Sequence, residues 1–135
     1  MKNLWRNYLR GLALASTIGM ASAAIAGDYQ KVVAAGQTLK VTFYLAIHAD
    51  CTSIGDITVR VTQSPANGTV TTKKAVDFPN FAPTSDRAHC NSRRVPSVQI
   101  DYRPEANFVG SDSVSLDVIY PTGGEQQDSF HIVVK

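Results

Sequence analysis

Four residues of the types that bind soft metals or form disulfides stand close together in two pairs: His48 with Cys51, and His89 with Cys90. Two imidazoles and two thiolates could form a tetrahedral site for zinc or copper. The spacing argues against this, because no C-x-x-C or H-x-x-H pair occurs and adjacent residues such as His89 and Cys90 tend to point apart. We therefore expect a Cys51–Cys90 disulfide and no bound cofactor, with the metal site as the alternative hypothesis.

The first 26 residues have the three parts of a cleavable secretory signal. An uncharged apolar run over residues 11–26 ends in Ala-x-Ala, and the basic residues before it are Lys2, Arg6 and Arg10. About 16 apolar residues are too few to span a bilayer. We expect cleavage after Ala26, or otherwise after Ala23, to give a periplasmic or secreted protein with no membrane span. That oxidising compartment favours the disulfide.

Removing residues 1–26 changes the charge of the chain. The remaining residues, 27–135, number 109, which suits one domain with one core. Three of the 13 basic residues leave with the signal, so ten basic and 11 acidic residues remain and the formal net charge is −1. This balance gives no electrostatic reason to expect a nucleic-acid partner.

Apolar residues take every second position in several short segments, as they do in strands with one buried face. The clearest segments are residues 37–47, 56–62, 97–103, 113–120 and 129–135, with shorter ones at 68–73 and 30–34. The residues expected to point inward are Leu39, Val41, Phe43, Leu45, Ile47, Ile57, Val59, Val61, Val98, Ile100, Tyr102, Val114, Leu116, Val118, Tyr120, Phe130, Ile132 and Val134. About seven strands in 109 residues predict an all-β antiparallel sandwich.

The segment from residue 74 to residue 96 interrupts this pattern. Its apolar residues are scattered, and a structureless stretch of this length is uncommon unless it is functional or tied down. Because Cys90 lies inside it, we expect the disulfide to fasten this excursion to one end of the sandwich, close to the strand before Cys51. Recognition often depends on loops held by a rigid scaffold. The candidate interaction residues in the excursion are Phe78, Phe81, Arg87, Arg93 and Arg94.

Two motifs carry a family resemblance. Residues 65–70 match P-x-x-G-T-V, and residues 102–113 match Y-x-P-x-x-N-F-x-G-x-D-S. These segments resemble the bacterial immunoglobulin-like and cadherin-like repeats, which occur in tandem in large surface proteins, whereas this chain has a single copy. The resemblance implies an immunoglobulin-like sandwich with Greek-key connections. The acidic run that opens calcium-binding members is not evident here.

The residues of these motifs have physical roles that point to structure rather than catalysis. Tyr102 ends a strand with its ring inward, Pro104 stops the strand pairing, and Asp112 can cap the next turn. The full set of expected structural residues is Pro65, Gly68, Tyr102, Pro104, Asn107, Phe108, Gly110 and Asp112.

The sequence contains no catalytic motif that we could identify, and no spacing suggests a triad. We therefore expect a non-enzymatic structural or protein-interaction module at the cell envelope, with an unknown protein or cell-surface partner. The alternative is a periplasmic copper- or zinc-binding protein that uses His48, Cys51, His89 and Cys90.

Overall fold

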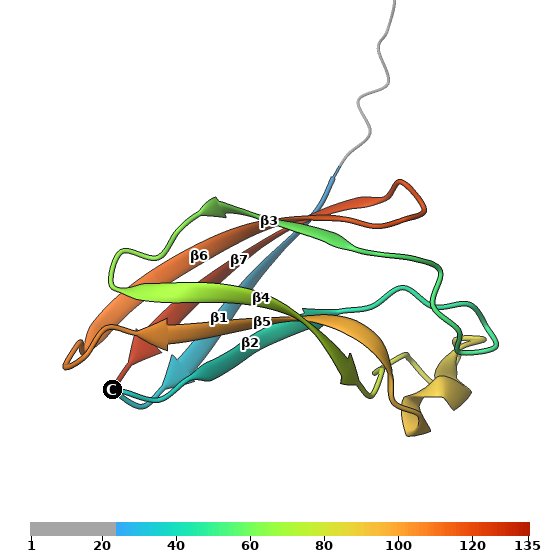
Figure 1. Cartoon of the computed structure of the whole chain (residues 1–135), viewed down its shortest axis with the longest axis horizontal. Coiled ribbons are helices and arrows are strands. Elements are labelled where there is room, and N and C mark those ends of the chain that lie inside the picture. The colour runs from blue at the N-terminus through green and yellow to red at the C-terminus, as the bar shows by residue number, and fades with distance from the viewer. Residues whose placement is uncertain (1–23) are drawn as a thin grey trace, which may run out of the picture.

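The computed structural model describes residues 24–135, and these form seven β-strands and one short 3-10 helix (Figure 1). The elements in chain order are β1 (Ile25–Val33), β2 (Leu39–Tyr44), β3 (Thr58–Gln63), β4 (Gly68–Asp77), η1 (Ala88–Ser92), β5 (Val95–Pro104), β6 (Gly110–Ile119) and β7 (Glu125–Val134). The expected all-β fold class is therefore confirmed.

The strands form two sheets that face one another (Figure 1). One sheet has the order β1-β7-β6-β3 and the other has the order β2-β5-β4. All neighbours are antiparallel except β1, which runs parallel to β7. Strands β1 and β3 are the edges of the first sheet, and β2 and β4 are the edges of the second.

The main core lies between the sheets and is built mostly from alternating residues of β5, β6 and β7. Ile100 and Tyr102 of β5 contribute from one sheet. The inward residues of the other sheet, each at most 2% exposed, are Val114, Leu116, Val118, Phe130, Ile132 and Val134. The period-2 prediction is confirmed for all of these residues.

Strand β2 departs from the predicted alternation. The pairing of β2 with β5 shifts between Lys40 and Thr42, so Val41 is an extra residue, as in a β-bulge. After this irregularity Tyr44 is buried and Phe43 is only partly buried. The prediction that Phe43 points inward and Tyr44 outward is therefore wrong, because one extra residue exchanges the two faces of a strand.

The other differences concern strand ends. The excursion is shorter than predicted, since β4 continues to Asp77 and β5 begins at Val95. Val61, expected to be inward, is exposed on edge strand β3, where the pairing shifts a second time, between Val61 and Gln63. Strand β1 begins at Ile25, so cleavage after Ala26 would remove its first two residues. The rest of the predicted signal, residues 1–23, lies outside the described residues.

No helix within residues 24–135 has the length and apolar character needed to cross a membrane.

Candidate functional site

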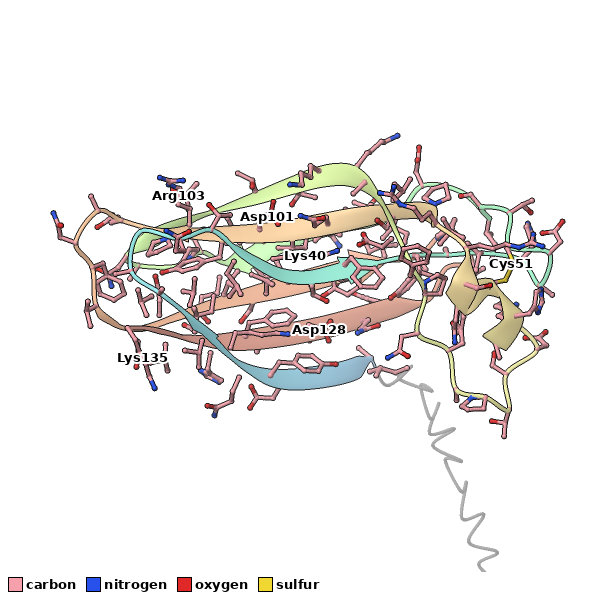
Figure 2. The ribbon with its side chains drawn as sticks, turned by 90° about the horizontal axis from the view of Figure 1, so that it is seen from below. Lys40, Cys51, Asp101, Arg103, Asp128 and Lys135 are labelled. Atoms are coloured by element: carbon pink, nitrogen blue, oxygen red, sulfur yellow. A yellow bond between two sulfur atoms is a disulfide. The ribbon has the colours of Figure 1, made fainter. Side chains whose placement is uncertain are left out.

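The predicted disulfide is present and lies at one end of the sandwich (Figure 2). Cys51 belongs to the connection between β2 and β3, and Cys90 belongs to η1. The two sulfurs are bonded at 2.06 Å, and Cys90 is fully buried. The bridge therefore joins two connections that are distant in sequence, as expected.

The alternative metal site is only partly assembled. The ligand atoms of Cys51, His89 and Cys90 lie within 4.8 Å of one another, and His48 is not part of this group. A ring nitrogen of His89 lies 3.7 Å from the sulfur of Cys90. Both sulfurs are used by the disulfide, so this set offers thiolate ligands only after reduction.

The loop between β4 and β5, residues 78–94, is here called the tethered loop. A small second core lies beneath it, made of buried Ile47, Cys90 and Val95 with Leu45, Cys51 and Phe81 packed against them. Asn91 fixes Phe81 twice, because its side chain accepts a hydrogen bond from the backbone N–H of Phe81 and donates one to the backbone carbonyl, both at 2.9 Å. The tethered loop is thus held by more than its disulfide.

The five candidate interaction residues have different surroundings. Phe78 is exposed, whereas Phe81 packs on the second core. Arg87 holds the tethered loop down, since its Nε donates to the carbonyl of Ile47 at 2.9 Å. Arg93 and Arg94 are exposed and do not line the cavity described next.

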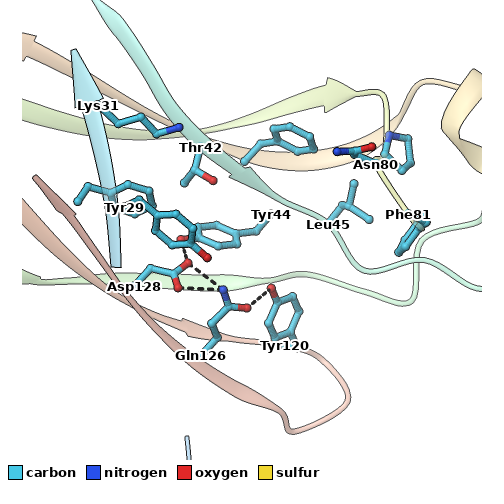
Figure 3. A pocket seen from close by; sticks show the side chains of 13 residues that line it. Tyr29, Lys31, Thr42, Tyr44, Leu45, Asn80, Phe81, Tyr120, Gln126 and Asp128 are labelled. Atoms are coloured by element: carbon cyan, nitrogen blue, oxygen red, sulfur yellow. Dashed lines mark hydrogen bonds between the residues drawn. The ribbon is translucent and has the colours of Figure 1, made fainter. Parts of the chain in front are cut away.

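A cavity of about 370 Å³ opens between edge strands β1 and β2, and we call it the aromatic groove (Figure 3). Its aromatic lining residues are Tyr29, Phe43, Tyr44, Phe81, Tyr120 and Phe130. Its polar lining residues are Lys31, Thr42, Asn80, Gln126 and Asp128, and Leu45 and Pro79 complete it. The tethered loop contributes Pro79, Asn80 and Phe81, so the disulfide end of the molecule and the groove form one region.

A hydrogen-bonded chain crosses the floor of the groove (Figure 3). The carboxylate of Asp128, which is 2% exposed, accepts a hydrogen bond from the hydroxyl of Tyr44 at 2.6 Å. The amide nitrogen of Gln126 lies 3.0 and 2.8 Å from its two oxygens, and the hydroxyl of Tyr120 donates to the Gln126 carbonyl oxygen at 3.1 Å. No ion pair among the described residues involves Asp128.

The tyrosines of the floor remain protonated at neutral pH. Burial raises the pKa of Tyr44 far above its usual value, and the hydrogen bond to Asp128 raises it further. Burial also raises the pKa of Tyr120, and the negative charge of Asp128 adds to this shift. Both phenols therefore act as neutral hydrogen-bond donors beside the carboxylate.

The outer part of the groove presents aromatic faces. Tyr29 stacks on Phe130 with ring centroids 5.1 Å apart and an angle of 20° between the planes, and it remains 43% exposed. On the opposite wall, the ammonium group of Lys40 lies over the ring of Phe43, 4.7 Å from the ring centroid. The groove thus combines aromatic walls with a buried carboxylate, an arrangement suited to binding a polar or charged group.

The motif residues lie at the other end of the sandwich and connect β5, β6 and the turn between β3 and β4. The hydroxyl of Tyr102 donates to Asp112 at 2.9 Å, and the backbone N–H groups of Ala66, Asn67 and Ser113 donate to the same carboxylate at 2.8–2.9 Å. Asp112 thus caps the earlier turn between β3 and β4, rather than the turn that follows it. Burial opposes ionisation, but these hydrogen bonds outweigh it and hold the pKa of Asp112 below its usual value.

The remaining motif residues shape the turns around this carboxylate. Asn107 and Gly110 have positive φ values of 66° and 141°. Pro104 ends β5 opposite Gly68, and Phe108 packs against the main core. Pro65 lies in the turn before β4 and is partly buried.

Sequence reasoning did not identify Asp128 or Gln126 as site residues. A signal was present, because residues 126 and 128 continue the even-numbered inward series of Phe130, Ile132 and Val134. A carboxylate at an inward position of a strand is unusual, since acidic side chains are seldom fully buried. The strand predicted from the sequence begins at Ser129, so its inward series does not include residue 128.

No protein-family model matches the chain, and no curated protein matches it. Among solved structures, the solution structure of Amebosin is similar at a TM-score of 0.42 and 11% identity, covering 84% of this chain and all of that one.

Proposed function

We propose that this chain is an exported, non-enzymatic, immunoglobulin-like module that binds a partner of the cell envelope in the aromatic groove. The observation that carries the proposal is the groove itself, a preformed cavity of about 370 Å³ with aromatic walls and a buried carboxylate on its floor. Cavities of this size with a few convergent polar groups are typical of binding sites.

The order of the strands supports an immunoglobulin-like topology. If the strands are lettered A to G along the chain, B, E and D form one sheet, and C, F and G form the other. This is the distribution found in immunoglobulin sandwiches, with strand A placed beside G instead of B. The connections β1–β2, β2–β3, β3–β4 and β5–β6 pass between the sheets, as Greek-key connections do.

The rigidity of the groove supports a binding role. Its walls come from edge strands β1 and β2 and from the tethered loop, which the disulfide and the Asn91–Phe81 hydrogen bonds hold in place. A binding site that is ordered in advance loses less conformational entropy when its partner arrives.

The test measures retention of the mature protein on the envelope fraction of the cells that make it. The double variant Tyr29→Ser/Phe43→Ser removes two partly exposed rings of the groove, and we expect retention to fall at least tenfold. The matched control is Val109→Ser, which removes an apolar residue that is 65% exposed in the turn between β5 and β6, at the other end of the sandwich. Equal retention of the groove variant and the wild type would refute the proposal.

A second candidate function is metal binding, and the proximity of Cys51, His89 and Cys90 favours it. This function requires the reduced protein. Thiol counting on the protein as isolated, followed by titration with zinc or copper(I), tests it. Two free thiols with one bound metal, weakened by His89→Ala, would support this function, whereas no free thiol and no metal would refute it.

A further inference from the structure

Asp128 differs from the other buried carboxylates of the described chain in having no cation and no backbone N–H as a partner. The other buried aspartates are Asp101, which pairs with Lys73, Asp117, which pairs with Arg60, and Asp112, which accepts three backbone N–H groups. Asp128 is held only by the hydroxyl of Tyr44 and the amide of Gln126. Buried charges in proteins are normally paired. When ionised, the carboxylate of Asp128 therefore places an unpaired negative charge on the floor of the groove.

The aromatic walls above this carboxylate attract positively charged groups, as the carboxylate itself does. The faces of aromatic rings are negative and attract ammonium and guanidinium groups. Tyr29 and Tyr120 line the groove on the side of Asp128 (Figure 3). Phe43, a residue of β2, also lines the groove. One face of the Phe43 ring already makes a cation–π contact with the ammonium group of Lys40, so this ring can interact with a cation.

The basic residue that lines the groove does not neutralise the floor. Lys31 extends toward Thr42 in Figure 3, and no ion pair joins it to Asp128. The charge is thus available to a cation from outside. Such a cation would be attracted by the carboxylate even without touching it, because Asp128 is only 2% exposed and buried charges are less screened than charges in water.

We propose that the aromatic groove receives the ammonium or guanidinium group of a lysine or arginine side chain, carried by an extended segment of a partner protein. This inference rests on the proposed function and names the chemistry of its partner. The extended segment follows from the place of the groove between two edge strands. Strand β2 pairs only with β5, so its other edge offers backbone groups that an added strand can use while its side chain enters the cavity.

The first experiment changes the charge of the partner. The envelope fraction is treated to acetylate its lysines and to convert its arginines to citrulline, which removes both positive charges. A second portion is reductively methylated, which leaves lysine charged. We expect retention of the protein to fall at least tenfold on the neutralised fraction and to stay within twofold on the methylated one. Digestion of the envelope with proteinase K should also abolish retention, and its failure to do so would overturn a protein partner.

The second experiment changes the charge of the groove. Asp128→Asn keeps the shape of the side chain and removes its charge, and we expect retention to fall at least tenfold. The matched control, Asp117→Asn, neutralises another buried aspartate, which is paired with Arg60 away from the groove, and retention should be unchanged. Thermal unfolding of both variants shows whether each is folded. Lys31→Met removes a positive charge from the lining of the groove, which repels an incoming cation, and should increase retention. A loss of retention would point to an anionic ligand and overturn the inference.

The experiments distinguish the proposed binding role of the groove from the inference that its partner inserts a basic side chain. If Tyr29→Ser/Phe43→Ser loses retention but Asp128→Asn and the neutralised envelope do not, the groove binds a partner without a basic anchor, and only the present inference falls. If the groove variants are all retained like the wild type, the proposed function falls with it.

Discussion

Two tyrosine–aspartate pairs lie at opposite ends of the sandwich. Both contain a hydrogen bond from a tyrosine hydroxyl to a carboxylate, but the surroundings of the two carboxylates differ. Tyr102 donates to Asp112 at 2.9 Å, and Tyr44 donates to Asp128 at 2.6 Å. Three backbone N–H groups also donate to Asp112, so that carboxylate fixes a turn and a strand start. Asp128 has no backbone donor and lines a cavity instead. The contacts around each aspartate therefore separate a structural pair from a candidate binding pair.

The structural pair predicts a pH-dependent loss of stability. Because the pKa of Asp112 is lowered in the folded state, its charged form stabilises the fold above the unfolded pKa of about 3.9, and this contribution is lost as the pH falls through the folded-state pKa. Asp112→Asn should lower the free energy of unfolding at pH 7 by about 1–3 kcal/mol. Urea denaturation from pH 7 to pH 3 should show the difference from the wild type shrinking in acid. A constant difference across that range would contradict the assignment.

Gly68 predicts a steric effect beside the same pair. A Cβ atom at this position would lie 2.4 Å from Cε2 of Tyr102 and 2.7 Å from the carbonyl oxygen of Arg103. Gly68→Ala should therefore destabilise the domain by about 1–3 kcal/mol, the usual cost of overpacking. Gly124→Ala is the control, because the nearest atom to its Cβ would be 3.9 Å away. Equal melting temperatures of the two variants would show that Gly68 is not confined as described.

At the scale of the elements, the alternating pattern predicted β5, β6 and β7 well because their inward positions are uniformly apolar over the core. It could not place the faces of β2. Phe43 and Tyr44 both fit a buried position, and an irregularity at Val41 decides between them. Such a shift depends on pairing with β5, which is a property of two strands and not of one. Tyr44 therefore reaches Asp128 through a feature that the alternation does not contain.

The candidate site was predictable only in part for a related reason. Two cysteines in a small domain with a predicted export signal predicted the disulfide, and the irregular composition of residues 74–96 predicted the tethered loop. The groove gathers β1, β2, the loop after β4, and the hairpin of β6 and β7. Only the order of the strands in the sheets brings these segments together, and so a single-segment pattern could not reveal them.

The tethered loop yields a prediction about local order. The side chain of Asn91 makes two hydrogen bonds with the backbone of Phe81, so Asn91→Ala should leave both backbone groups without these partners. Local opening of residues 78–94 should become easier by about 1–3 kcal/mol. Hydrogen exchange measured by mass spectrometry should report this change in the loop and not in β6 or β7. The control is Ser92→Ala, which removes an exposed hydroxyl that donates a hydrogen bond to the backbone carbonyl of His89. Unchanged exchange in Asn91→Ala would contradict the role of Asn91.

At the scale of the whole molecule, the domain has two cores of unequal size. The main core joins both sheets, whereas the second core, with Ile47, Cys90 and Val95, joins the tethered loop to the β2–β3 connection and to the start of β5. The aromatic groove lies where the two regions meet, because Tyr44 and Phe130 belong to the main core and Phe81 to the second. The shape of the groove therefore depends on both cores.

The division into two cores predicts that removal of the disulfide destabilises the domain and affects the tethered loop first. In the chain-entropy model, a bridge between residues 39 apart stabilises a fold by about 3–4 kcal/mol, so Cys51→Ser/Cys90→Ser should lower the free energy of unfolding by that amount. Hydrogen exchange should rise first in residues 78–94, since β5, β6 and β7 keep the main core.

Retention on the envelope fraction should fall in the same variant, even below its unfolding transition, because the groove loses the fixed wall that Phe81 provides. Asn91→Ala, which loosens the loop but keeps the bridge, should lie between this variant and the wild type. If the cysteine variant exchanges uniformly along the chain, the two cores unfold as one. If it is retained like the wild type, the wall formed by the tethered loop does not contribute to the binding site.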